Sequence, residues 1–241
     1  MKKVLVWHFA RADRKLGYND GRQIVVGETL TVEVTEDRPL GVCWWGLHGS
    51  ERAIDALGNA PGPLACRDVL SGEIVSDDNK ACASERTCLA MADATNLLHE
   101  LACQWTEEAL DAVEKAGLAV DPRSRAAIKM KRKWVRGEAN DYELSAAWDA
   151  ANEAIEIMGY GPSHRAALAA ASATSKAAHY AAGSAGRASA AVCGSLAEVA
   201  AGVSIAFNPA WDARNAAHNA DLERRLRELL HLPPSDEEET P

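Results

Sequence analysis

The sequence predicts an α+β protein, with a mixed sheet and one short helix in the N-terminal part and an all-α, Ala-rich helical bundle after it. Up to about residue 92, short apolar runs alternate with Gly, Pro and Asp-Gly, which is typical of strands joined by turns. Beyond it, Ala dominates and apolar residues recur at helical spacing. We therefore expect a sheet-rich domain at 1–92, a helical bundle at 93–232 and a disordered acidic tail at 233–241.

The first half contains several apolar runs of strand length. In residues 29–34 a two-residue alternation places Leu30, Val32 and Val34 on one face. Ser50 is expected to cap a short helix over residues 51–57, which Asn59 to Pro63 ends. Residues 81–90 fit either a last strand or an irregular link. The other strands are predicted at 4–9, 24–26, 42–45, 64–66 and 69–75.

The second half carries start and stop signals for helices. Gly117 ends a helix that begins near Asn96, Asp121-Pro122 starts the next, and Asn140 caps a third that runs to Met158. An Ala-rich tract over 163–203 and a last helix to about residue 232 follow, with weak breaks expected at Gly183, Gly186 and Gly194. Small side chains let helices approach closely, so the tract needs large partners. The candidates are Trp105, Trp134, Trp148 and Trp211.

The charge balance narrows the classes of partner. The chain has 26 Lys and Arg against 35 Asp and Glu, a formal net charge of −9. This argues against direct nucleic-acid binding by phosphate neutralisation and suits a protein partner with a basic surface. One helix holds a basic cluster, expected to be a solvated face; a nucleic-acid site and pairing with the acidic tail are the alternatives. The cluster consists of Arg123, Arg125, Lys129, Lys131, Arg132, Lys133 and Arg136.

Neither a membrane segment nor a metal site is expected. The start of the chain lacks the length and the cleavage site of a signal peptide, and no apolar run reaches the ~20 residues of a membrane span. The six Cys are scattered without a Cys-x-x-Cys pair, which favours reduced core residues over disulfides or zinc ligands. We therefore expect a cytoplasmic protein without metal or cofactor.

Two sets of residues are candidates for catalysis. His8, Ser50 and either Glu73 or Glu85 follow the order found in mono-ADP-ribosyltransferase-like folds, where the Glu stabilises an oxocarbenium-like transition state. Ordinary roles account for them equally: a strand end, a helix cap and solvent-facing strand positions. The second set pairs His48 with Cys43 or Cys66 as a nucleophile pair; the alternative is a His48 ring bonded to local backbone.

A Trp pair is the candidate for binding. Trp44 and Trp45 are neighbours on a predicted strand, so one should be buried and the other exposed. An exposed Trp is a common anchor in protein interfaces. With the adjacent His48, the pair is the predicted binding site.

Short motifs in the first half resemble an uncharacterised domain family of tailed-phage and prophage proteins. The resemblance covers about residues 4–90, and the order and spacing of its motifs carry it. Two departures are the double Trp44-Trp45 and Gly58-Asn59 after the predicted helix. The family has no established activity, so no catalytic residue is implied. The matching positions are Gly27-Glu28-Thr29-Leu30, Cys43, Gly46-Leu47-His48, Leu70-Ser71-Gly72-Glu73-Ile74 and Lys80.

The second half resembles an Ala-rich helical domain of phage and bacterial immunity-type proteins. The matching stretches are residues 125–129, 134–139 and 144–151. Together the resemblances imply a phage accessory protein in the cytoplasm of a bacterial host. The leading hypothesis is a non-enzymatic protein that binds a host complex and inhibits a defence system such as CRISPR interference. The alternatives are an ADP-ribosyltransferase-like enzyme and a structural module that self-associates through its Ala-rich helices.

Overall fold

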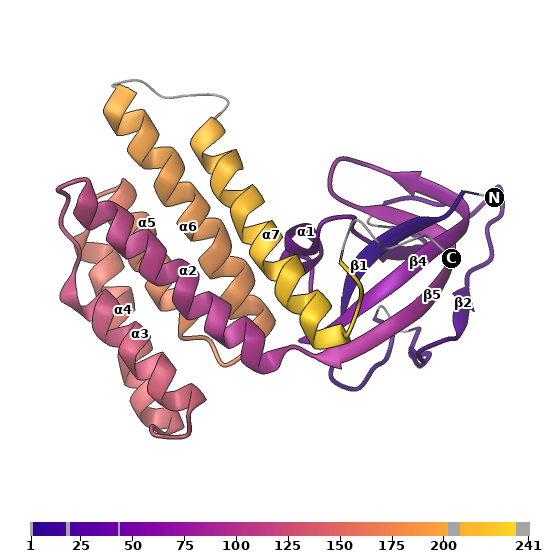
Figure 1. Ribbon diagram of the computed structural model, residues 1–241, viewed down its shortest axis with the longest axis horizontal. Coiled ribbons are helices and arrows are strands. Elements are labelled where there is room, and N and C mark those ends of the chain that lie inside the picture. Colours follow the sequence, from indigo (N-terminus) through magenta and orange to yellow (C-terminus); the bar gives the residue numbers. More distant parts are fainter. Residues whose placement is uncertain (1, 18–19, 43, 202–207, 235–241) are drawn as a thin grey trace. The chain divides into compact units, whose positions relative to one another are not determined.

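A computed structural model, which describes residues 2–17, 20–42, 44–201 and 208–234, confirms the α+β class. The chain forms two compact units (Figure 1). The sheet unit consists of Met1–Thr95 with Asp221–Pro241, and the helical unit of Asn96–Ala220. The first boundary lies three residues beyond the expected residue 92. The expected bundle ran on to residue 232, whereas residues from Asp221 onward group with the sheet; of the expected tail at 233–241, residues 235–241 lie outside the described residues.

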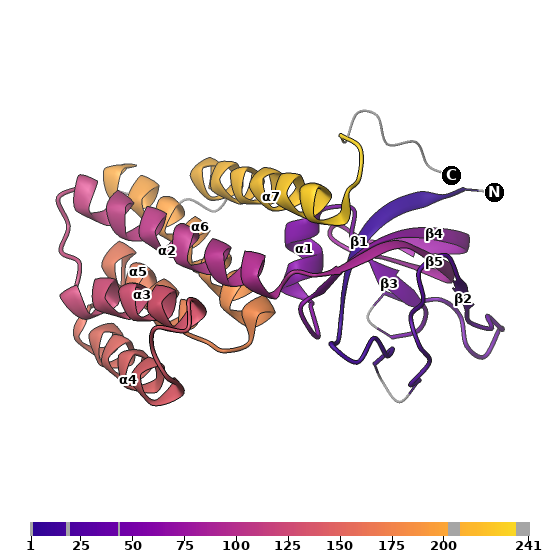
Figure 2. The same cartoon turned by 60° about the horizontal axis from the view of Figure 1, so that its bottom comes forward.

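The sheet unit has five strands: β1 (Val4–Ala10), β2 (Thr29–Thr31), β3 (Leu47–Gly49), β4 (Leu64–Ser76) and β5 (Ala81–Asp93). Their order is β1-β4-β5, and both β2 and β3 pair with β5 along its other edge (Figure 2). All of these pairs are antiparallel, where the sequence analysis expected a mixed sheet. The reason is local: β4 and β5 are joined by a tight turn in which Asp77 N–H donates to Lys80 O, and a hairpin is antiparallel.

Several predicted strands differ from the observed ones. Residues 64–66 and 69–75 form one strand with a register shift at Arg67/Asp68, and residues 81–90 are a strand, not a link. Residues 24–26 contribute only an isolated bridge from Val26 to Cys88. Of the strand expected at 42–45, Val42 and Trp44 are turn residues and Trp45 forms only an isolated bridge, in which Gly41 N–H donates to Trp45 O; Cys43 lies outside the described residues.

Strand β3 lies where the sequence analysis expected a break. Gly49 makes this possible, because a Cβ there would come within 2.4 Å of the Val6 Cγ2. Ser50 follows it with its backbone N–H and C=O bonded to Trp7, so it does not cap the helix. The helix is α1 (Ala53–Gly58), and its first N–H, that of Ala53, donates to Glu223 Oε1 at 3.1 Å.

Two faces of the sheet carry different side chains. His8, Cys66 and Asp68 alternate with Trp7 and Arg67, so these two groups point to opposite sides. On the second side Trp7 lies between two guanidinium groups, those of Arg67 and of Arg227 from α7 (Pro209–Leu230). The C-terminal part of α7 therefore belongs to the core of the sheet unit, where its Leu222, Leu226 and Leu230 are buried.

The helical unit contains α2 (Thr95–Lys115), α3 (Pro122–Val135), α4 (Asp141–Ile157), α5 (Pro162–Ala173), α6 (Ala178–Ala201) and the first part of α7. The predicted caps are present. Asp121 accepts the Arg123 N–H, Asn140 and Glu143 form a capping box, and Gly117 adopts φ +74° at the end of α2. The Ala-rich tract breaks at residues 174–177, not at Gly183, Gly186 or Gly194. Those three glycines lie inside α6 and are buried.

Only some of the Trp side chains expected to pack against the Ala-rich tract are buried. Trp105 is fully buried and stacks on His218, with ring centroids 4.6 Å apart. Glu108 binds the same region of α7, accepting from Arg214 at 2.8 Å and lying 3.4 Å from His218. Trp148 and Trp211 are exposed instead. None of the described helices is long and apolar enough to span a membrane.

Candidate functional site

The residues predicted for ADP-ribosyl transfer are not gathered in one place. His8 pairs with Cys66 across β1 and β4, whereas Glu85 pairs with Ser71, whose hydroxyl donates to it at 2.8 Å. Five residues of β4 separate these pairs, about 16 Å at the rise of a strand. The odd spacing also puts them on opposite faces. Glu73 is exposed and Ser50 is held by Trp7, so the structure does not bring a His, a Ser and a Glu together.

His48 lies on β3 and is half-buried. Its backbone carbonyl accepts a 2.8 Å hydrogen bond from Arg86 Nη1. Burial and the nearby Arg86 lower the pKa of His48, while the Gly46 and Gly41 backbone acts in the opposite direction. This local backbone contact matches the non-catalytic alternative for His48. The Cys43 partner of the proposed nucleophile pair lies outside the described residues.

The Trp pair lies in a surface segment that we call the Trp44 loop, residues 33–45. The side chain of Trp44 is 68 % exposed. Its Nε1 donates to Pro39 O at 3.3 Å, and its backbone N–H donates to Gly41 O. Gly41 lies directly against the indole, since a Cβ there would be 2.4 Å from Trp44 Cδ1. The exposed ring is therefore held in place by its own loop.

Trp45 is only half-exposed and contacts other residues of the loop. Its Nε1 donates to Glu33 O at 3.0 Å, and the guanidinium of Arg38 lies 3.7 Å from the ring centroid. Arg38 also closes a turn with Thr35 through two backbone hydrogen bonds. The tip of this turn is Glu36-Asp37, and both side chains are exposed. The loop thus combines a fixed exposed indole with acidic neighbours.

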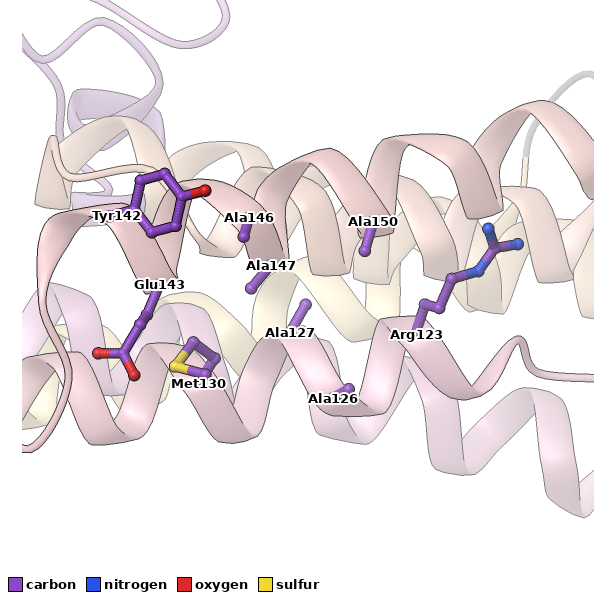
Figure 3. Close-up of a pocket in the computed structure, with 9 residues that line it drawn as sticks. All are labelled: Arg123, Ala126, Ala127, Met130, Tyr142, Glu143, Ala146, Ala147 and Ala150. Carbon is purple, nitrogen blue, oxygen red and sulfur yellow. The ribbon is translucent and has the colours of Figure 1, made fainter.

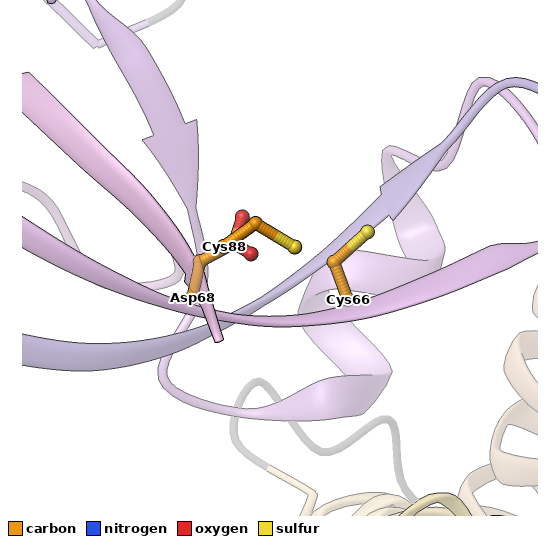
Figure 4. A group of neighbouring side chains, drawn as sticks. All are labelled: Cys66, Asp68 and Cys88. Atoms are coloured by element: carbon orange, nitrogen blue, oxygen red, sulfur yellow. The ribbon is translucent and has the colours of Figure 1, made fainter. Parts of the chain in front are cut away.

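A buried polar cluster lies inside the sheet unit, and we call it the thiol–carboxylate cluster: Cys66, Asp68 and Cys88. One ligand atom of each residue lies within 4.8 Å of the others, and all three side chains are buried. They rise from the same side of the sheet (Figure 4). The sequence analysis took these cysteines for plain core residues, because Cys66 and Cys88 are far apart in sequence. The polar alternation Cys66-x-Asp68 was the available signal.

Two cationic or titratable groups border the cluster. Arg86 Nε lies 3.2 Å from Asp68 Oδ2, and His8 Nδ1 lies 3.8 Å from the same oxygen. Burial raises the pKa of Asp68, against the opposing effect of Arg86. A hydrogen bond with Cys88, together with burial, raises the pKa of the Cys66 thiol. Burial lowers the pKa of His8 well below its ordinary value, so the imidazole is neutral.

A second buried cluster lies in the helical unit around Lys131. This side chain is 0 % exposed, donates to Ser175 O at 2.7 Å and lies 4.2 Å from the centroid of Trp134. Burial lowers its pKa to about 8. Burial also raises the pKa of Cys103 to about 11 and, helped by Lys131, lowers that of His99 to about 4. His99 meets Trp134 edge to face at 5.3 Å.

The burial of Lys131 corrects the prediction that the whole basic cluster is a solvated face. The Lys131 side chain leaves α3 toward the interior, where its amine donates to the Ser175 carbonyl. The arginines of the cluster are on the surface, but they pair with acids of the same unit. These pairs are Arg123 with Asp121 and Glu153, Arg125 with Asp111 and Glu114, Arg132 with Glu107, and Arg136 with Glu138. Such pairing leaves little free positive charge for phosphates.

A cavity of about 330 Å³ lies between α3 and α4 (Figure 3). Most of its lining is alanine, with Arg123 at one end and Glu143 at the other. Both of these polar groups are already engaged, Arg123 with Asp121 and Glu143 with the Asn140 N–H. The cavity therefore offers apolar surface but no converging set of free polar groups of the kind that active sites use.

Comparisons with protein-family models, with curated proteins and with solved structures found no match.

Proposed function

We propose that this protein is a non-enzymatic binding protein whose Trp44 loop docks on another protein. The observation that carries the proposal is the 68 % exposed Trp44 indole, whose Nε1 donates to Pro39 O while the Trp44 backbone N–H donates to Gly41 O. Trp is enriched among the residues that dominate binding energy. A side chain fixed before binding loses little conformational freedom in the complex, which favours affinity.

Charge around the indole indicates the kind of partner. Exposed Glu33, Glu36 and Asp37 lie in the Trp44 loop, and the whole chain carries a net charge of −9. A complementary partner has an apolar pocket for the indole and basic residues around it, and opposite charges steer the two surfaces together. The motif resemblance to phage domains supports a more specific proposal, that the partner is a host complex such as a CRISPR-type defence assembly.

Self-association is the second candidate, and one observation favours it. The helical unit exposes large apolar side chains at α4 and just after it: Tyr142 is 83 % exposed and Tyr160 is 99 % exposed, with Ile157 between them. Light scattering across a range of concentrations tests this candidate. A molecular mass that stays at that of one chain, 25.8 kDa, excludes self-association under those conditions.

The binding proposal is tested by placing a photo-crosslinking amino acid at position 44 in cells of a candidate bacterial host. We expect one dominant adduct, in which the label at position 44 joins this chain to a subunit of a nucleic-acid-handling complex. A matched control carries the same label at Tyr180, an exposed aromatic of the helical unit. Equal adducts from both positions, or none from position 44, would contradict the proposal.

A further inference from the structure

We propose that the thiol–carboxylate cluster is a structural Zn²⁺ site, with Cys66, Cys88 and Asp68 as ligands and His8 as the fourth. The proposal is independent of the Trp44 loop. Three ligand atoms lie within 4.8 Å of one another, and they come from neighbouring strands of a single sheet. Bringing them to the about 2.0–2.3 Å bond lengths of a tetrahedral zinc site requires side-chain rotation but no change of fold.

Unmet hydrogen bonds in the cluster point to a ligand. Asp68 is 0 % exposed, and neither of its carboxylate oxygens has a hydrogen bond of standard geometry; the Cys88 thiol and the Arg86 Nε, at 3.2 Å from Oδ2, lie beside it. His8 Nδ1 is likewise buried without a partner. Buried polar atoms are rarely left unsatisfied in folded proteins. A metal ion among these atoms would satisfy the carboxylate and the imidazole together.

The position of His8 supports its role as the fourth ligand. His8 and Cys66 are directly paired across β1 and β4, and their side chains share a face of the sheet. The Nδ1 atom lies 3.8 Å from Asp68 Oδ2, which is close to the spacing of two ligands around one zinc ion. The ring is therefore the nearest imidazole that a small side-chain movement could bring to an ion held by Asp68.

The charges of the occupied site balance. Two thiolates and one carboxylate contribute three negative charges, and Zn²⁺ with the Arg86 guanidinium contributes three positive ones. In the structure, the Cys66 and Cys88 Sγ atoms lie near the Leu64 and Ala90 carbonyl oxygens, at 3.7 and 3.5 Å. Binding releases the two thiol protons to solvent and involves no oxidation or reduction.

The donor set selects the metal and its role. Two sulfurs, one imidazole nitrogen and one carboxylate oxygen suit Zn²⁺ and do not suit Mg²⁺ or Ca²⁺, which take oxygen ligands. The cluster is packed against Ala10, Ile24 and Leu64 in the core. Four protein ligands in such an enclosed place leave no position for water, so the ion would hold β1, β4 and β5 together and would not catalyse.

The test uses the full chain, purified without chelator and then dialysed. We expect one zinc per chain by elemental analysis, and a higher unfolding temperature with zinc than with EDTA. Replacement by Co²⁺ should give thiolate charge-transfer absorption with the visible bands of a tetrahedral site. A wild-type chain that holds no metal and shows no such absorption overturns the proposal, as does a Cys66–Cys88 disulfide found by mass analysis.

Variants assign the ligands. C66S and C88S should weaken zinc binding by more than about 100-fold and H8A by about 10- to 100-fold, since even losing an outer-shell partner costs that much. The matched controls are C82S, a buried cysteine of the same strand β5, and C103S in the helical unit; both should retain zinc. Unchanged affinity in C66S or C88S overturns the site, and unchanged affinity in H8A overturns the four-ligand arrangement.

Discussion

The sheet unit and the helical unit each bury a cation, but only the sheet unit provides a carboxylate for it. Arg86 is 3 % exposed and lies 3.2 Å from Asp68. Lys131 is 0 % exposed, and its contacts are the Ser175 carbonyl and the ring of Trp134. An Arg guanidinium cannot lose its proton inside a protein, whereas a Lys ammonium can. The counter-charge is therefore obligatory in one unit and dispensable in the other.

This contrast also bears on function. A buried Lys with a lowered pKa and a buried Cys-Asp pair both resemble catalytic chemistry when seen alone. Neither lines the cavity between α3 and α4, and neither is exposed to solvent. We therefore propose that both clusters stabilise their own units and that recognition belongs to the exposed Trp44 loop.

The largest expected effect is that of D68N, which removes the counter-charge of Arg86. Breaking a buried ion pair leaves the other charge uncompensated and costs about 3–5 kcal/mol. Urea unfolding at neutral pH with EDTA present measures this without any contribution from metal. E73Q, at an exposed position of the same strand, is the control, expected to change stability by less than about 0.5 kcal/mol. A loss of stability below about 1 kcal/mol in D68N would contradict the claim that buried Arg86 requires its counter-charge.

K131M should have the opposite sign. Met has a similar shape, and replacing a buried charge that lacks a counter-ion by an apolar side chain is neutral or stabilising by about 1–2 kcal/mol at pH 7. The exposed neighbour K133M on the same helix should remain within about 0.5 kcal/mol of wild type. Strong destabilisation of K131M would show that the Ser175 and Trp134 contacts outweigh the burial of the charge.

The same lysine predicts a pH dependence. Below pH 8 Lys131 is protonated in both the folded and the unfolded chain, and burial of its charge destabilises the fold fully. Between about 8 and its ordinary pKa of 10.5, the folded chain has released the proton and the unfolded chain has not, so stability rises with pH. The gain is at most about 3–4 kcal/mol. Wild type minus K131M, measured by urea unfolding across this range, isolates it; a flat difference would contradict the assignment.

The smallest expected effect is that of a surface pair on the same helix. Arg132 binds Glu107 with two hydrogen bonds, at 3.0 and 2.6 Å, and both side chains are partly in solvent. Exposed ion pairs contribute about 0.2–1 kcal/mol. R132Q should therefore destabilise by less than about 1 kcal/mol, with less effect at high salt. A loss of stability as large as that of D68N would mean that burial does not determine how much a charged side chain contributes to the stability of this protein.

Local signals explain how much of the fold the sequence could predict. The caps at Asp121 and Asn140 and the stop at Gly117 act within a few residues of themselves, and each helix end lies where its signal stands. Strand β3 depends instead on Gly49 meeting Val6, a contact distant in sequence. The sheet unit likewise includes the end of α7, which helical periodicity alone cannot assign to a sheet.

The candidate sites also differ in whether they depend on local sequence or on contacts between residues distant in sequence. The expectation of one buried and one exposed Trp assumed a strand at 42–45; Trp44 is exposed, but in a turn, where alternation does not apply, and Trp45 is half-exposed. The thiol–carboxylate cluster depends on the register between β4 and β5, which brings Asp68 opposite Cys88. The burial of Lys131 depends on Ser175, which lies 44 residues away. The sequence around Lys131 does not indicate that this one side chain of the basic cluster is buried.

The central claim is that recognition lies at Trp44 and not in the buried clusters. Once the partner identified by crosslinking has been purified, isothermal titration calorimetry of this partner against wild type and against W44A tests the claim most directly. We predict affinity at least about 30-fold weaker for W44A, as for an interface residue worth about 2 kcal/mol, with a free energy of unfolding within about 0.5 kcal/mol of wild type. Affinity within about threefold of wild type would contradict the claim.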